Sequence, residues 1–99
     1  MPKILRSAAS LADLDRIYDY VAASSPQNAD DLINEFQCAL QLLADKPNIG
    51  KSRPELHAGL RSWRVHRFVI FYLSSADAVT VVRILHAAMD ISIRHFPEH

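Results

Sequence analysis

Three features that the sequence lacks exclude several classes of protein. Cysteine occurs once, at Cys38, so neither an intramolecular disulfide nor a cysteine-rich metal site can form. Glycine occurs only twice, which excludes a glycine-rich phosphate-binding loop. The longest apolar run, residues 68–73, is far too short to span a membrane. No long apolar segment follows the first basic residues, so we expect no secretory signal and predict a cytoplasmic protein.

The composition is typical of one small globular domain. Hydrophobic residues make up 49% of the 99 residues and charged residues 22%, a balance found in folded rather than disordered chains. A chain of this length buries about two-thirds of its unfolded surface, so it can fold without disulfides. We therefore predict a single domain over residues 1–99. We expect no cofactor and no metal, because the five histidines show no ligand spacing.

Charge is unevenly distributed along a chain whose net charge is zero with histidine neutral. Residues 1–50 hold four basic and seven acidic residues, a net charge of −3, and residues 51–99 hold the reverse, a net charge of +3. Between residues 51 and 67, five basic residues accompany a single acidic residue, Glu55. This asymmetry indicates a basic surface that binds nucleic acid or an acidic partner. The alternative is a solvated strand face with no binding role. Zero net charge argues against a nucleic-acid-binding protein that contacts only the phosphate backbone.

The first half of the sequence begins with a short strand and an amphipathic helix. Residues 3–6 have an apolar centre, and apolar residues then recur at spacings of three and four until about Ser24. Either Ser7 or Ser10 can cap this helix, and Ser10 followed by Asp13 approximates a capping box.

A second amphipathic helix follows at once. Ser25 is a good N-cap, Pro26 suits the first helical position, and the apolar periodicity continues to a polar loop at residues 47–59. Two such helices joined by a few residues predict an antiparallel hairpin. The helical residues expected to be buried are Leu11, Leu14, Tyr18, Tyr20, Val21, Phe36 and Cys38.

The second half of the sequence has strand-like patterns. Residues 60–67 alternate, and residues 68–73 are apolar on both faces, as in a central strand covered on both sides. Residues 79–86 are β-branched, and a short helix or turn is expected over 87–96, with order ending at Pro97. We predict an α+β fold of order β-α-α-β-β-β, in which a helical hairpin packs on a mostly antiparallel sheet and a short C-terminal helix follows.

This order of elements and the residues that fill it resemble the ParE/RelE superfamily of bacterial type II toxins. The matching elements of the first helix and the loop are Asp13-Leu14-x-x-Ile17-x-x-Tyr20 and Pro47-x-x-Gly50-x-x-Arg53-x-Glu55-Leu56. The matching elements of the strands are Gly59-Leu60-Arg61, Ile70-Phe71-Tyr72 and Val82-Arg83-Ile84-Leu85-His86-x-x-x-Asp90. Together they cover residues 5–90, and the Arg-Ile-Leu-His run followed by Asp resembles the ParE branch most.

The resemblance implies one of two activities. ParE-like toxins trap DNA gyrase in a cleaved complex with DNA and block replication, whereas RelE-like toxins cut mRNA in the ribosomal A site without metal. Both branches imply a cognate antitoxin, ParD-like in the ParE branch, whose flexible C-terminal segment wraps the toxin. The partners implied are therefore an antitoxin, in a toxin–antitoxin hetero-oligomer, and DNA gyrase as the target.

The residues favour the gyrase alternative. A metal-free nuclease needs phosphate-binding cations and a proton-transferring group, for which the candidates are Arg61, Arg83 and His86. RelE-like enzymes carry lysines where this sequence has only Lys51, and no tyrosine follows Tyr72. We therefore predict a gyrase-binding toxin without catalytic residues, with an mRNA endonuclease as the alternative. A third interpretation is an inactive toxin-fold protein that only binds its partner.

The residues expected to contact the target are Arg61, Arg64, Arg67, Arg83 and His86. The antitoxin is expected to contact the exposed helical faces and the sheet around the arginines of the strands. Structural roles remain open for three residues: Arg83 can pair with a carboxylate such as Glu55 or Asp90, His86 can hydrogen-bond locally, and Trp63 can pack on the sheet.

Overall fold

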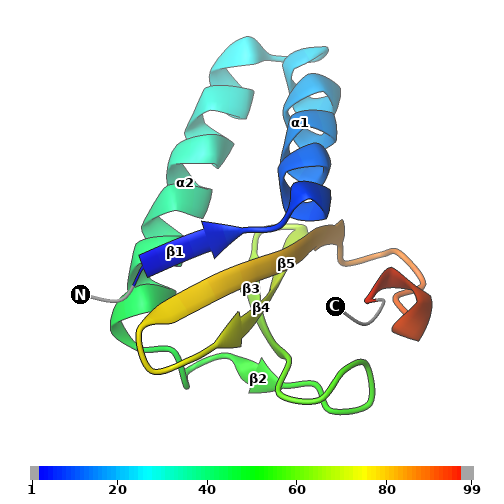
Figure 1. Cartoon of the computed structure of the whole chain (residues 1–99). Coiled ribbons are helices and arrows are strands. Elements are labelled where there is room, and N and C mark those ends of the chain that lie inside the picture. The colour runs from blue at the N-terminus through cyan, green and yellow to red at the C-terminus, as the bar shows by residue number, and fades with distance from the viewer. Residues whose placement is uncertain (1–2, 97–99) are drawn as a thin grey trace.

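The computed structural model describes residues 3–96. Its elements, in chain order, are β1 (Lys3–Arg6), α1 (Ala8–Ala22), α2 (Pro26–Asp45), β2 (Lys51–Ser52), β3 (Arg61–Val65), β4 (Phe68–Ser74), β5 (Ala78–His86) and a 3-10 helix, η1 (Ile93–His95). The two helices form a hairpin beside a five-stranded sheet (Figure 1). The predicted α+β fold is confirmed. No helix within residues 3–96 is long and apolar enough to cross a membrane.

The sheet has the strand order β1-β5-β4-β3-β2. Strand β1 pairs in parallel with β5, and every other pairing is antiparallel, as the prediction of a mostly antiparallel sheet requires. Two details differ from expectation. Lys51–Ser52 lies inside the predicted loop but forms an edge strand beside β3. Arg53 N–H donates to the Leu60 carbonyl at 2.8 Å and extends this pairing, so the start of the loop is held against the sheet. The expected terminal helix is reduced to η1, and the expected end of order at Pro97 lies outside the described residues.

Serine caps both helices at their N-termini. The Ser25 hydroxyl accepts from Asn28 N–H at 3.2 Å, and Pro26 takes the first helical position, as predicted. Ser7, one of the two predicted candidates, caps α1 by accepting from Ser10 N–H at 3.0 Å. The capping box predicted for Ser10 and Asp13 is wrong, because Ser10 already lies within the helix and Asp13 is buried against β5.

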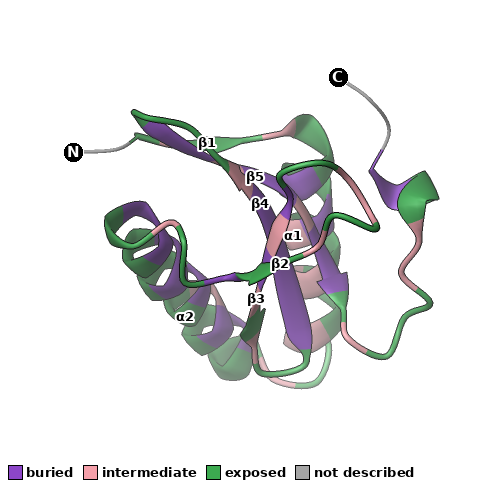
Figure 2. Cartoon of the chain, turned by 90° about the horizontal axis from the view of Figure 1, so that it is seen from below, coloured by how far each residue is buried: buried purple, intermediate pink, exposed green. Residues whose placement is uncertain are grey.

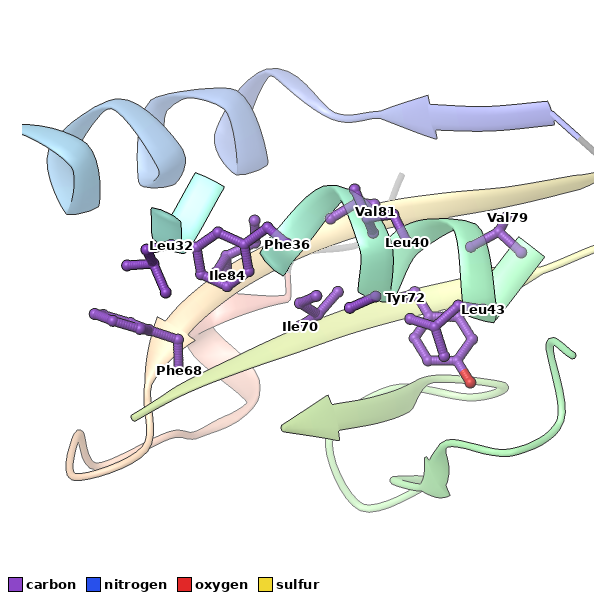
Figure 3. Packing of buried hydrophobic residues seen from close by; sticks show 11 residues of the cluster. Leu32, Phe36, Leu40, Leu43, Phe68, Ile70, Tyr72, Val79, Val81 and Ile84 are labelled. Atoms are coloured by element: carbon purple, nitrogen blue, oxygen red, sulfur yellow. The ribbon is translucent and has the colours of Figure 1, made fainter. Parts of the chain in front are cut away.

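The main core lies between the helices and the sheet. Helix α2 contributes its apolar face, and Phe36 packs edge-on against Phe68 of β4 with ring centroids 6.0 Å apart. Figure 3 shows this face of α2 against the side chains of β4 and β5. Trp63 is partly buried against the same cluster, which confirms its interpretation as sheet packing. The buried residues of this core are Leu32, Phe36, Ala39, Leu40, Leu43, Phe68, Ile70, Tyr72, Val79, Val81 and Ile84.

A second, smaller core covers the opposite face of the sheet. Phe96 follows η1 and stacks edge-on against Phe71, with ring centroids 4.9 Å apart. Figure 2 shows the C-terminal segment on the side of the sheet away from α2 and the buried residues concentrated on the central strands. The prediction that residues 68–73 form a strand covered on both faces is therefore confirmed. The buried residues of this core are Leu60, Val69, Phe71, Val82, Leu85 and Phe96.

Three helical residues expected in the core are exposed. Tyr20 is 75% exposed and Leu11 is 47% exposed, and Cys38 lies on the solvent side of α2. Helix α1 lies along β5, and Asp13 faces Ile84, only two residues before β5 ends. Tyr20 lies two helical turns further, about 10 Å along the axis. It therefore projects past the end of the strand instead of into the core.

Candidate functional site

The arginine of β5 is held by a buried carboxylate. Arg83 Nε donates to Asp13 Oδ2 at 2.7 Å and Nη2 donates to Asp13 Oδ1 at 2.8 Å, a bidentate pair. Arg16 also binds Asp13 Oδ1, and the Asp13 side chain is only 1% exposed. The hydrogen bond to Asp13 raises the pKa of the Arg83 guanidinium above its ordinary value. The interpretation that Arg83 pairs with a carboxylate is confirmed, but Glu55 and Asp90 were the wrong partners.

The same carboxylate completes the hydrogen bonding of the β5 edge. Strand β1 pairs only with Ala78–Val81, and Val82 is bulged out of register with β4. Beyond β1, Ser7 N–H and Oγ donate to the carbonyls of Val81 at 3.0 Å and Val82 at 2.7 Å, and Ile84 N–H donates to Asp13 at 3.0 Å. The start of α1 thus takes over from β1 as the partner of β5. Buried backbone groups need such partners, so this cluster has a structural role.

Arg61 is also bound by backbone groups. Its Nη1 donates to the carbonyl of Gly50 at 2.8 Å and to that of Asn48 at 3.3 Å. The buried Tyr72 hydroxyl lies beside it, donating to the Pro47 carbonyl at 2.8 Å and accepting from Gly50 N–H at 3.0 Å. These contacts fix residues 47–50 to the sheet.

The three nuclease candidates do not converge on one point. On β4, Arg61 is in register with Tyr72 and His86 with Phe68, four residues apart, or about 13 Å along the strand. Arg83 and His86 do line one hollow, but the guanidinium of Arg83 is occupied by Asp13. No group of three or more metal-ligating side chains that could hold an ion occurs within residues 3–96.

His86 and Arg67 lie together at one end of the sheet. His86 Nδ1 accepts from Ala88 N–H at 3.0 Å, and the ring meets Phe68 edge-on at 5.3 Å between centroids. The expected local hydrogen bond of His86 is thus present. Arg67 is exposed in the two-residue turn between β3 and β4. Its carbonyl accepts from Ala87 N–H at 2.7 Å, which ties the turn to the residue after β5.

Arg64 lines a hollow of about 640 Å³ on the face of the sheet opposite the helices. Its Nε donates to the His66 carbonyl at 2.8 Å, and its side chain is exposed. Lys51 and Arg53 join it in lining the hollow, where Glu55 is the single acidic residue. The remaining lining is mostly apolar and includes Val69 and Phe71 of the second core and Ile91 of the C-terminal segment. The three basic residues of this hollow come from residues 51–67, the segment in which the sequence concentrates positive charge.

Two further hollows meet at the end of α1. One, of about 330 Å³, is lined by Arg16, Met89 and the Asp13–Arg83 pair, and the other, of about 490 Å³, by His66 and Arg67. Both are also lined by Tyr20, Phe68 and His86. Sequence reasoning missed Tyr20 and Met89, although Tyr20 closes the first-helix motif, because helical periodicity does not show where the neighbouring strand ends.

Comparisons with known proteins agree with this geometry. A family model described as the ParE toxin of the type II toxin–antitoxin system parDE matches residues 4–91. Toxin ParE1 of Caulobacter vibrioides is 31% identical over 80 residues, covering 80% of this chain and 82% of its own length. Toxin ParE1 of Mycobacterium tuberculosis is 30% identical over 91 residues, covering 90% and 93%.

Solved structures share the fold. A chain of the chromosomal ParDE toxin–antitoxin system from P. aeruginosa superposes with a TM-score of 0.72 at 25% identity, covering 87% of this chain and 96% of its own. A chain of the RelBE2 toxin–antitoxin complex from Mycobacterium tuberculosis superposes with a TM-score of 0.63 at 21% identity, covering 87% and 99%. The resemblance seen in the sequence is confirmed: the chain belongs to the ParE toxin family of type II toxin–antitoxin systems.

Proposed function

We propose that this toxin acts by binding DNA gyrase and blocking replication, without cutting RNA. The observation that carries the proposal is the state of Arg83. Both carboxylate oxygens of buried Asp13 hold its guanidinium, so the cation that a nuclease would direct at the scissile phosphate is engaged inside the fold. Membership of the ParE family supports the same target. The proposal implies a cytoplasmic location.

The proposal includes a cognate antitoxin that silences the toxin. The similar solved chains come from toxin–antitoxin assemblies, which supports such a partner. The hollow around Lys51, Arg53 and Arg64 suits an acidic, apolar tail, because its lining combines basic side chains with apolar ones. A disordered tail that orders on binding needs a large contact area to offset the entropy it loses. The walls of the hollow, whose volume is about 640 Å³, provide part of that contact area.

Two assays on the purified chain test the proposed target. The first follows supercoiling by gyrase and the accumulation of cleaved, linear DNA. The second follows mRNA on translating ribosomes. We expect cleaved DNA and intact mRNA. Codon-positioned cuts in mRNA with unaffected gyrase would overturn the proposal and favour the endonuclease alternative.

A variant separates the two activities further. His86→Ala removes the one exposed proton-transferring group among the nuclease candidates, and its imidazole makes only a local bond and a ring contact. A nuclease that depends on His86 for proton transfer would slow by about 100-fold or more in the variant. Arg94→Ala, another exposed basic residue, is the control. If mRNA cleavage is detected and falls only in His86→Ala, the gyrase proposal is wrong.

A further inference from the structure

Helix α1, the β3–β4 turn and the end of β5 meet at one end of the molecule. We propose that this end surface binds the target protein and that Tyr20 makes the central contact. The end surface consists of Tyr20, Arg67, Phe68, His86 and Met89. The inference rests on the proposed function, because it assigns the contact with the target to this surface.

The end surface exposes large side chains over a hollow. Tyr20 is 75% exposed and Met89 is 44% exposed, whereas Phe68, which lines both adjoining hollows, is 8% exposed. No hydrogen bond within residues 3–96 engages the Tyr20 hydroxyl, unlike the hydroxyls of Tyr18 and Tyr72. Aromatic residues, methionine and arginine are enriched at protein interfaces, and tyrosine and arginine are frequent hot spots.

The charges of the end surface favour a partner that presents a carboxylate. The acidic groups that line its hollows are already bonded: Glu35 pairs with His66, and Asp31 accepts from the Gln27 amide at 2.9 Å. Asp13 is held by the arginine pair described above. Within residues 3–96, no acidic side chain lies within ion-pair distance of the Arg67 guanidinium.

His86 adds a second free donor to this surface. Its Nδ1 accepts a hydrogen bond from Ala88 N–H, so in the neutral ring the proton is assigned to Nε2, which becomes a donor. The end surface therefore offers the Arg67 guanidinium, the His86 imidazole and the Tyr20 hydroxyl. An acidic side chain next to an apolar one on the partner complements this set.

The end surface is held in place before any partner binds. The His66–Glu35 pair ties the turn to α2, and Ala87 N–H bonds the Arg67 carbonyl from the β5 side. His66 has φ of 54°, which matches the positive φ that the first position of a two-residue hairpin turn requires. A preorganised surface loses less entropy on binding, which favours tight association.

The same features favour a protein over nucleic acid as the partner. Phosphate binding needs several free cations along a path, and here Arg16 and Arg83 are bound by Asp13. Within residues 3–96, Arg67 is the one arginine lining the two hollows that has no ion pair, so the end surface offers a single cation and no path of them. Duplex or single-stranded DNA as the ligand is therefore an outcome that would contradict the inference.

The test uses the full chain and intact gyrase holoenzyme. Tyr20→Ala and Arg67→Ala change exposed side chains, and Leu42→Ala and Arg94→Ala are controls at exposed positions elsewhere. Binding to gyrase and growth arrest after expression without antitoxin are measured for each variant. We expect Tyr20→Ala to weaken binding by about 30-fold or more and Arg67→Ala by about 10-fold. The controls should stay within about two-fold. Co-purification with the cognate antitoxin and the unfolding midpoint show that the variants are folded.

The outcomes separate the two proposals. If the wild type arrests growth without binding gyrase, the gyrase proposal fails, and growth arrest by the variants then decides the surface. Full growth arrest by Tyr20→Ala and Arg67→Ala overturns the surface whatever the target. Wild-type binding to DNA alone that Tyr20→Ala abolishes overturns the protein partner. A wild type that neither binds gyrase nor arrests growth overturns both proposals.

Discussion

Two neighbouring clusters, one around Asp13 and one around Tyr20 of α1, contain arginines in contrasting surroundings. In the first, the Arg83 side chain is 19% exposed and bound by Asp13, which is 1% exposed. In the second, two helical turns along, Arg67 is exposed beside Tyr20 without an ion pair among residues 3–96. The comparison shows that burial and pairing, not residue type, separate an arginine that holds the fold from one available for recognition. Variants of each cluster should therefore differ in what they damage.

The largest effect on stability is expected at the first cluster. Asp13→Asn leaves the partly buried Arg83 guanidinium without its counter-charge, and breaking such a pair costs about 3 kcal/mol of unfolding free energy. Urea denaturation of wild type and variant measures the loss. Asp15→Asn, an exposed acidic residue of the same helix, is the control and should change stability by less than about 0.5 kcal/mol. An equal, small change in both variants would show that the pair has no structural role.

An intermediate effect is expected at Tyr72, at the end of the sheet remote from the end surface. Tyr72→Phe leaves the Pro47 carbonyl and Gly50 N–H without their buried partner, at a cost of about 1–3 kcal/mol near neutral pH. Tyr18→Phe removes a hydroxyl that bonds Asp30 on the surface and should cost less than about 0.5 kcal/mol.

The difference between wild type and Tyr72→Phe also depends on pH. Burial raises the pKa of the Tyr72 phenol above its ordinary value of 10.0. As the pH rises past about 10, the unfolded state loses this proton before the folded state does, so wild-type stability falls. The contribution is fully present below pH 10 and is lost above it. Unfolding midpoints between pH 8 and 11 should therefore converge for the two proteins, and a constant gap would argue against the buried phenol.

The smallest effect on stability is expected at the end surface. Tyr20→Ala removes a side chain that is 75% exposed, so the unfolding free energy should change by less than about 0.5 kcal/mol. Thermal unfolding followed by circular dichroism checks this. A loss of toxicity at unchanged stability would sharpen the contrast with Asp13→Asn, whereas a large destabilisation would mean that Tyr20 belongs to the fold.

Much of the fold could be predicted because local chemistry specifies it. Ser25 and Pro26 start α2 as expected, and the apolar run of residues 68–73 became a strand covered on both faces. The candidate site was less predictable. Arg83 was recognised as either functional or paired, but its partner Asp13 lies 70 residues away in the sequence, and no local pattern reports such a contact.

The sequence by itself determined the order of the main helices and strands, the basic second half and the resemblance to a toxin family, because these depend on periodicity, capping residues, charge and motifs. The tertiary structure decided which polar groups are free. Burial of Asp13 against β5 engages Arg83, and the end of that strand at His86 leaves Tyr20 in solvent. Exposure depends on where neighbouring elements end in space, and helical periodicity carries no information about that distance.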